Sequence, residues 1–188
     1  MKVVEEHLAA VARLVAATPR EPLAAMADRL WQAYREEAQV FACGNGGSSA
    51  TASHFIEDLA KGITPPPGRP RFRAISLVDS VPTLTAYGND LGFEHVFAEP
   101  LRNLVRPGDV LVAISCSGRS ANVLRAMEAA REAGAAVIAL TGAAGEPMEE
   151  RADICLRAPA RGLQELEDAH LVIAHALYLE LKARAEAG

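Results

Sequence analysis

A glycine-rich stretch constrains the fold of this chain more than any other feature of the sequence. It lies between two segments whose patterns are typical of regular secondary structure. Residues 40–43 form a short apolar run, the sequence GNGGSS follows over 44–49, and a helix-like segment with polar groups on one side continues to residue 62. That order predicts a strand, a tight loop and a helix. Glycine permits backbone conformations that other residues avoid, and the N–H groups that begin a helix favour anions. The stretch is interpreted as a phosphate-binding loop, with an ordinary turn as the alternative.

A second loop of similar design follows a later apolar run. Residues 110–114 predict a buried strand, and SCSGRS over 115–120 leads into a helical pattern from 122 to 134. Three serines and a glycine stand where the first loop has its glycines. Because ligands of parallel sheets lie beyond the carboxyl ends of the strands, both loops are expected at one edge, holding a phosphorylated ligand between them.

The alternation of strand and helix patterns predicts an α/β fold. We expect a three-layer arrangement, with a five-stranded, mostly parallel sheet and helices on both of its faces. Two amphipathic helices, over 2–17 and 21–37, precede the first strand, so residues 1–37 should pack on the sheet and on a neighbouring subunit. With 188 residues, half of them hydrophobic, the chain suits a single domain over 1–188.

Composition excludes several classes of partner and compartment. The formal net charge is −5 and no run of like charge occurs, so neither nucleic acid nor a membrane surface is expected as a partner. The three cysteines are scattered, which is not a disulfide framework. No apolar run approaches 18 residues and the first residues lack a signal-peptide pattern, so the protein is expected to be cytoplasmic with reduced thiols.

Histidines and carboxylates on two predicted helices are candidates for metal binding or proton transfer. His54 and Asp58 are four residues apart and share a helix face, whereas Glu57 lies about 100° round from Asp58. Such a pair could bind a metal or move a proton, and a solvated ion pair is the alternative. On the last helix, Glu167 lies about 80° and roughly 12 Å from His175, so one small ion could not easily accept both.

Four motifs carry a resemblance to a known family. They are GNGGS at 44–48, NDLGF at 89–93, ISxSGxS at 114–120 and the late Gln-Glu segment that leads to a histidine. In this order the chain resembles the sugar isomerase (SIS) domain family from about residue 5 to 182, and within it the phosphoheptose isomerases. The resemblance implies a flavodoxin-like, SIS-type fold and a homotetramer with active sites between subunits. It also implies interconversion of sedoheptulose 7-phosphate and glycero-manno-heptose 7-phosphate through an enediol.

The resemblance also implies roles for individual residues. Asp58 would be the base and His175 the acid, with Glu57 as the alternative base. One Zn²⁺ per subunit would be held by His54, Asp58, Glu167 and His175, and no organic cofactor is implied. The substrate-binding positions would be Asn45, Gly46, Gly47, Ser48, Asn89, Asp90, Ser115, Cys116, Ser117, Ser120 and Glu167.

Three of those positions depart from the family pattern, and other functions remain open. Asp58 stands where Glu is usual, Glu167 where Gln is usual and Cys116 where Thr is usual. Two alternatives to the isomerase are a non-enzymatic SIS-domain protein that associates with a replication initiator and a regulatory sensor that binds a sugar phosphate without converting it. Retention of His54, Asp58 and His175 favours the enzyme.

Overall fold

The five predicted strands form one fully parallel sheet. The computed structural model describes residues 1–64 and 67–187; Pro65, Pro66 and Gly188, which belong to the predicted domain, lie outside the described residues. Within the described chain the strand order is β2-β1-β3-β4-β5, and every neighbouring pair is parallel. The strands are β1 (Gln39–Gly44), β2 (Arg73–Ser76), β3 (Val110–Ser115), β4 (Ala136–Gly142) and β5 (Ile154–Ala158).

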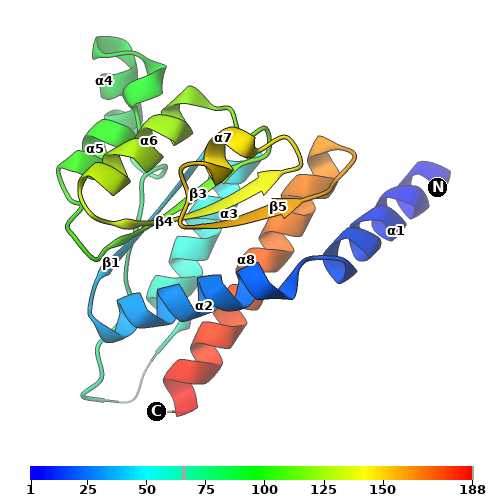
Figure 1. Cartoon of the computed structure of the whole chain (residues 1–188), viewed down its shortest axis with the longest axis horizontal. Helices are drawn as coiled ribbons and strands as arrows, with labels where there is room; N and C mark the ends of the chain where they lie inside the picture. Colours follow the sequence, from blue (N-terminus) through cyan, green and yellow to red (C-terminus); the bar gives the residue numbers. More distant parts are fainter. Residues whose placement is uncertain (65–66, 188) are drawn as a thin grey trace.

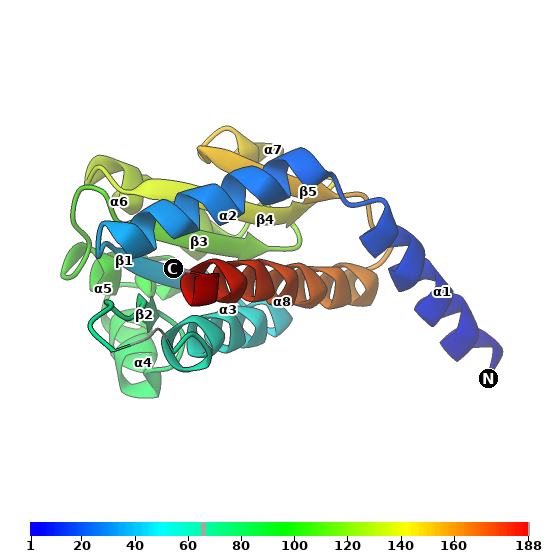
Figure 2. The same ribbon diagram turned by 90° about the horizontal axis from the view of Figure 1, so that it is seen from below.

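Helices cover both faces of this sheet, as Figures 1 and 2 show. One face carries α2 (Arg20–Arg35), α3 (Gly47–Glu57) and α8 (Leu163–Ala187). The other carries α5 (Ala98–Arg102), α6 (Ala121–Glu132) and α7 (Glu146–Glu149), with α4 (Val81–Asp90) beyond them. The three-layer α/β architecture predicted from the sequence is confirmed.

The strands β1, β3 and β4 are nearly continuous apolar runs because both of their faces are buried. Side chains alternate between the two faces of a strand, so Val40 and Ala42 pack toward α2, α3 and α8, while Phe41 and Cys43 pack toward α5 and α6. All four side chains are fully buried. A strand covered in this way positions its carboxyl-end loop rigidly.

Two local structures differ from the pattern expected of the sequence. The helix after the first loop continues past α3 as a π-helical turn, η1 (Asp58–Gly62), and a short turn, η2 (Phe93–His95), follows α4. Asn89 and Asp90, two of the expected substrate-binding positions, form the last turn of α4. Ser80 caps the start of this helix, and its end lies at Leu91, whose N–H donates to the Tyr87 carbonyl before Gly92 turns the chain with a φ of 101°.

The first helix, α1 (Lys2–Ala16), projects from the body of the molecule, as Figure 2 shows. It meets the start of α8, where His7 Nε2 and Asp168 Oδ2 are 2.7 Å apart. Much of its apolar surface is open: Val3, Val4 and Leu8 are all exposed. Among the described helices, none combines the length and apolar character needed to cross a membrane.

Candidate active site

The two predicted loops lie side by side at the carboxyl edge of the sheet. They follow β1 and β3, which are neighbouring strands with Gly44 opposite Ile114. The chain order reverses between these two strands, and ligands of open α/β sheets bind at such a point. Two contacts join the loops: Asn45 and Asn122 exchange hydrogen bonds of 2.9 and 2.8 Å, and Ser48 Oγ lies 3.7 Å from Cys116 Sγ. The expectation that the loops adjoin is confirmed.

The first loop turns into α3 through glycines and is partly occupied by the protein itself. Gly46 has a φ of 54°, a left-handed conformation that glycine adopts without strain. A Cβ added to the next residue, Gly47, would collide with the carboxylate of Glu167. That carboxylate therefore lies against the first turn of α3, where it disfavours a second anion. The charge of Glu167 also acts on Cys116, so it reaches both loops.

Hydroxyl groups gather in the second loop. Ser115 is buried, and its Oγ lies 3.4 Å from Ser117 Oγ and 3.1 Å from Ser120 Oγ. Gly118 adopts a φ of 65°, which turns the chain so that these hydroxyls face one another at the start of the 12-residue helix α6. Thr141 Oγ1 donates to the Ser115 carbonyl at 2.7 Å and holds the loop against β4. Three hydroxyls beside a helix N-terminus suit an anion such as phosphate.

Cys116 belongs to the second loop, faces Ser48 of the first loop and carries a neutral thiol. Burial raises its pKa above the ordinary value, and the charge of Glu167 raises it further, while the contact with Ser48 acts in the opposite direction. A protonated thiol is a weak hydrogen-bond donor, so Cys116 contributes less to anion binding than the neighbouring serines. Its contact with Ser48 instead joins the two loops.

Beyond the loops, α3 and α8 run parallel and bring distant residues into register. At their starts Glu167 meets Gly47, and farther along Tyr178 donates to the Gly62 carbonyl at 3.3 Å. Between these contacts the rings of His54 and His175 meet edge to face, with centroids 4.9 Å apart. With a rise of 1.5 Å per residue, His54 is about 10 Å along α3 from Gly47, so the two histidines lie well beyond the loops.

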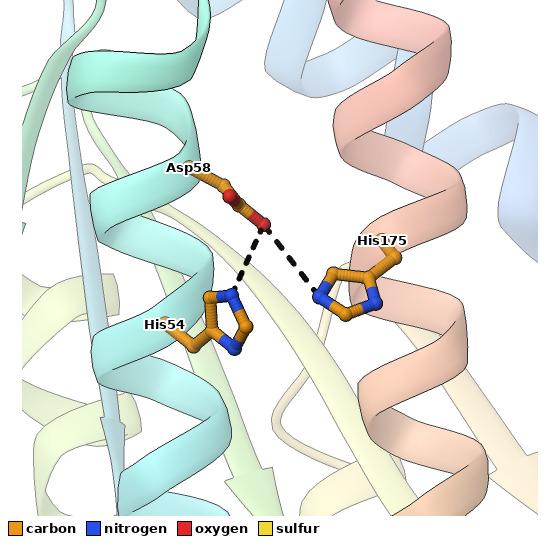
Figure 3. A group of neighbouring side chains, drawn as sticks. All are labelled: His54, Asp58 and His175. Atoms are coloured by element: carbon orange, nitrogen blue, oxygen red, sulfur yellow. Dashed lines mark ion pairs between the residues drawn. The ribbon is translucent and has the colours of Figure 1, made fainter.

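His54, Asp58 and His175 form a compact group between these two helices, shown in Figure 3. Asp58 Oδ2 lies 3.8 Å from the Nε2 atom of each histidine, and the candidate ligand atoms of the three residues are within 4.8 Å of one another. The convergence of His54 and Asp58 predicted from their spacing is confirmed. His175, 117 residues further on than Asp58, completes the group from α8.

The carboxylate of this group is sheltered and lacks a hydrogen bond. The Asp58 side chain is 17% exposed, against 45% for His54 and 43% for His175. Its Oδ2 is buried without a hydrogen-bond partner in the described part of the chain. Buried carboxylate oxygens rarely stay unpartnered, so this atom is suited to receive a cation or a proton. Two imidazoles and a carboxylate are also the donors that zinc prefers.

Several residues predicted for the site lie outside this group. Glu57 is exposed on another face of the helix, where its Oε1 lies 3.6 Å from Lys61 Nζ. Asn89 and Asp90 are exposed at the end of α4, and the amide of Asn89 donates to the Asp90 carboxylate at 2.8 Å. Glu167 also stands apart from the His54 group, as helical geometry predicted.

Two features of the site were not anticipated. One is Asn122, whose only signal in the sequence is its place just after the serine loop. The other is the π-helical turn that begins at Asp58, a local distortion often found at functional sites. Neither changes the hydrophobic periodicity enough to be detected from the sequence.

Comparison with known proteins gives consistent matches. Residues 5–142 match the SIS domain family. The phosphoheptose isomerase of Rhodospirillum rubrum is 46% identical over 147 residues, covering 76% of this chain and 75% of that protein. The phosphoheptose isomerase structure from Neisseria gonorrhoeae superposes with a TM-score of 0.89 at 34% identity, covering 97% of this chain and 98% of that one. The structure from Francisella tularensis gives a TM-score of 0.87 at 32% identity, covering 97% and 95%.

Proposed function

The chain belongs to the SIS domain family and, within it, to the phosphoheptose isomerases, and from this premise we propose that it interconverts sedoheptulose 7-phosphate and glycero-manno-heptose 7-phosphate. The observation that carries the proposal is the pairing of a hydroxyl-lined loop at the sheet edge with the His54, Asp58 and His175 group farther along α3 and α8. The loop would hold the phosphate. The group would act on the carbonyl end.

Isomerisation moves one proton between adjacent carbons, and the group offers the two functions required. In the proposed mechanism Asp58 removes the proton from the carbon beside the carbonyl and returns it to the former carbonyl carbon. His175 donates a proton to the carbonyl oxygen, giving the enediol, and takes one back from the neighbouring hydroxyl. The position of Asp58 supports this assignment, because its Oδ2 is buried without a hydrogen-bond partner in the described chain and lies 3.8 Å from His175 Nε2.

A divalent cation fits the same group. The unpartnered Oδ2 of Asp58 faces two Nε2 atoms, and the three residues could hold zinc while leaving a coordination position open. A bound cation would polarise the sugar carbonyl and stabilise charge on its oxygen, and would so replace proton donation by His175 Nε2, because a ring nitrogen cannot bind a metal and carry a proton at once. We include His54, Asp58 and His175 in the zinc site and place Glu167 at the edge of the sugar site, since its carboxylate lies against Gly47.

We further propose that the protein assembles as a homotetramer. The exposed apolar side chains Val3, Val4 and Leu8 on α1 and Val172 and Leu179 on α8 support burial against other subunits. Both histidines of the group are open to solvent, which leaves room for a neighbouring subunit to cover the site. Asn89 and Asp90, remote from the group within one chain, would then act on the sugar of another subunit.

Proton exchange tests the proposed function directly. Incubation with sedoheptulose 7-phosphate in deuterated water should introduce deuterium beside the carbonyl, as followed by proton NMR. Asp58→Asn is expected to lower the exchange rate at least about 100-fold, and Glu57→Gln to leave it within about threefold. The reverse order would transfer the role of base to Glu57.

The same assay separates the enzyme from the sensor. Tight binding of the sugar phosphate by the wild-type protein without exchange, in the presence and absence of added zinc, would support the sensor. Absence of both binding and exchange would favour a protein that only associates with a partner.

A further inference from the structure

A reciprocal pair of amides connects the two loops of the site. Asn45 Nδ2 donates to Asn122 Oδ1 at 2.9 Å, and Asn122 Nδ2 donates to Asn45 Oδ1 at 2.8 Å. The residues are 77 positions apart, and Asn122 is only 3% exposed. Asn45 belongs to the first loop, while Asn122 lies in the first turn of α6, just after the serines of the second loop.

The backbone of α6 decides which way both amides point. The Val123 N–H group donates to Asn122 Oδ1 at 3.0 Å. A backbone N–H can only donate, so the oxygen of Asn122 must lie on that side and its nitrogen on the other. The nitrogen in turn requires the oxygen of Asn45 opposite it. The orientation of the Asn45 amide is thus set through Asn122 by a peptide group of another element.

This fixed orientation determines what Asn45 can offer to a ligand. An amide has two N–H donors and a carbonyl oxygen with two lone pairs, and the pair uses one donor and one lone pair of Asn45. One N–H and one lone pair remain, at fixed places beside the serine loop. A free Asn side chain would have to be ordered when the ligand binds, at a cost in side-chain entropy.

Burial makes the arrangement sensitive to truncation at either end. Removing Asn45 leaves the buried Nδ2 donor of Asn122 unsatisfied, while its Oδ1 still accepts from Val123, and this is costlier than losing both amides together. The remaining direct contact between the loops, Ser48 with Cys116, is a long hydrogen bond to sulfur and gives little directional restraint. The amide pair is therefore the stronger of these two side-chain links between the loops, and it adds to the β1–β3 ladder that pairs Gly44 with Ile114.

We propose that Asn122 is a positioning residue that holds the Asn45 amide in one orientation and keeps the first loop in register with the phosphate-binding serines. The inference rests on the proposed function, because the ligand that Asn45 meets is taken to be the sugar phosphate. Asn122 acts through Asn45 and does not contact the substrate.

A double-mutant cycle tests the inference. The ratio kcat/KM is measured for the wild type, Asn122→Ala, Asn45→Ala and the double variant. Each single change is expected to lower kcat/KM about tenfold or more. The kcat/KM of the double variant should be within about threefold of that of the less active single variant. Asn103→Ala is the matched control, since this exposed amide donates to the Tyr87 hydroxyl at 3.2 Å, away from the loops. It should retain wild-type kcat/KM.

The outcomes separate a positioning role from a structural one. The inference would be overturned if the losses in kcat/KM of the two single variants multiply in the double variant. It would also be overturned if the kcat/KM of Asn122→Ala is within threefold of the wild-type value. If Asn122→Ala fails to fold, Asn122→Ser is used in the same cycle, because its hydroxyl retains an acceptor near Val123.

Failure of the proposed function gives a different result. If the wild type binds sedoheptulose 7-phosphate without converting it, the isomerase proposal is refuted, and the same cycle is carried out with dissociation constants from calorimetry. Coupled losses in affinity then support the positioning role, and independent losses overturn it. A wild-type protein that does not bind this sugar phosphate overturns both.

Discussion

His170 should make the protein sensitive to mild acid. This histidine lies on the inner face of α8 and is 1% exposed. Apart from a weak interaction with the Thr141 backbone, neither ring nitrogen has a hydrogen-bond partner within the described residues. Burial lowers its pKa from 6.5 to about 4, and the Thr141 backbone offsets this only in part. The folded protein thus keeps the ring neutral at a pH where the unfolded chain protonates it.

The sign and size of the effect follow from proton linkage. Between pH 6.5 and about 4 the unfolded state binds more protons at this residue, so the free energy of unfolding decreases as the pH falls through that window. Integrating between pH 7.5 and 5.0, a gap of about 2.5 pH units between the two pKa values makes His170 responsible for a loss of about 2 kcal/mol. Below the folded pKa the loss approaches about 3 kcal/mol.

Urea unfolding of His170→Leu at pH 7.5 and pH 5.0 tests this reasoning. At pH 7.5 the free energy of unfolding of the variant should be within about 1 kcal/mol of the wild-type value. The ring that it replaces is neutral, lies among apolar side chains and makes no strong hydrogen bond. The stability difference of the variant between the two pH values should be smaller than that of wild type by about 2 kcal/mol. Protein concentration is held constant, since dissociation of an oligomer also affects unfolding.

A second variant controls for the general effect of removing a histidine. His95→Gln removes a partly exposed ring, whose Nδ1 lies 3.7 Å from Glu99 Oε1, and measures how much of the change in pH dependence follows from losing any histidine. Equal pH dependence in His170→Leu and wild type would refute the assignment of the acid sensitivity to His170.

Three further predictions concern the loops and the thiols. Ser117→Ala should raise KM for the sugar phosphate about tenfold with a smaller change in kcat, as steady-state kinetics would show, because a hydroxyl that holds the phosphate acts mainly in binding. Gly47→Ala should cost less than about 1 kcal/mol in urea unfolding, since its Cβ would meet only the flexible end of the Glu167 side chain, which can move aside; a loss of about 3 kcal/mol would mean that this carboxylate is held in place. Cys43 and Cys155, whose pKa values burial raises to about 12 and about 11, should react slowly with a thiol reagent at pH 8 and rapidly in urea, and fast native labelling would contradict their burial.

Much of the fold could be predicted from local patterns. Short apolar runs marked the buried strands β1, β3 and β4, whereas the edge strands β2 and β5 contain Arg73, Ser76 and Arg157. The period of 3.6 marked the long helices, because burial on one face leaves a direct imprint on residue order. The same periodicity placed His54 and Asp58 on one helix face and separated Glu167 from His175. The ends of elements were less certain. Asn89 and Asp90 belong to α4, because this helix continues to Leu91 and the chain turns only at Gly92.

The sequence by itself therefore determined which elements form, where both loops fall and which side chains share a helix face, since all of these depend on neighbours within a few residues. Only the tertiary structure decided that α8 lies parallel to α3, that His175 meets Asp58, that Glu167 covers Gly47 and that Asn122 orients Asn45. These pairs are separated by 77 or more positions. Their contacts depend on how whole helices pack across a shared sheet, which no local pattern of residues encodes.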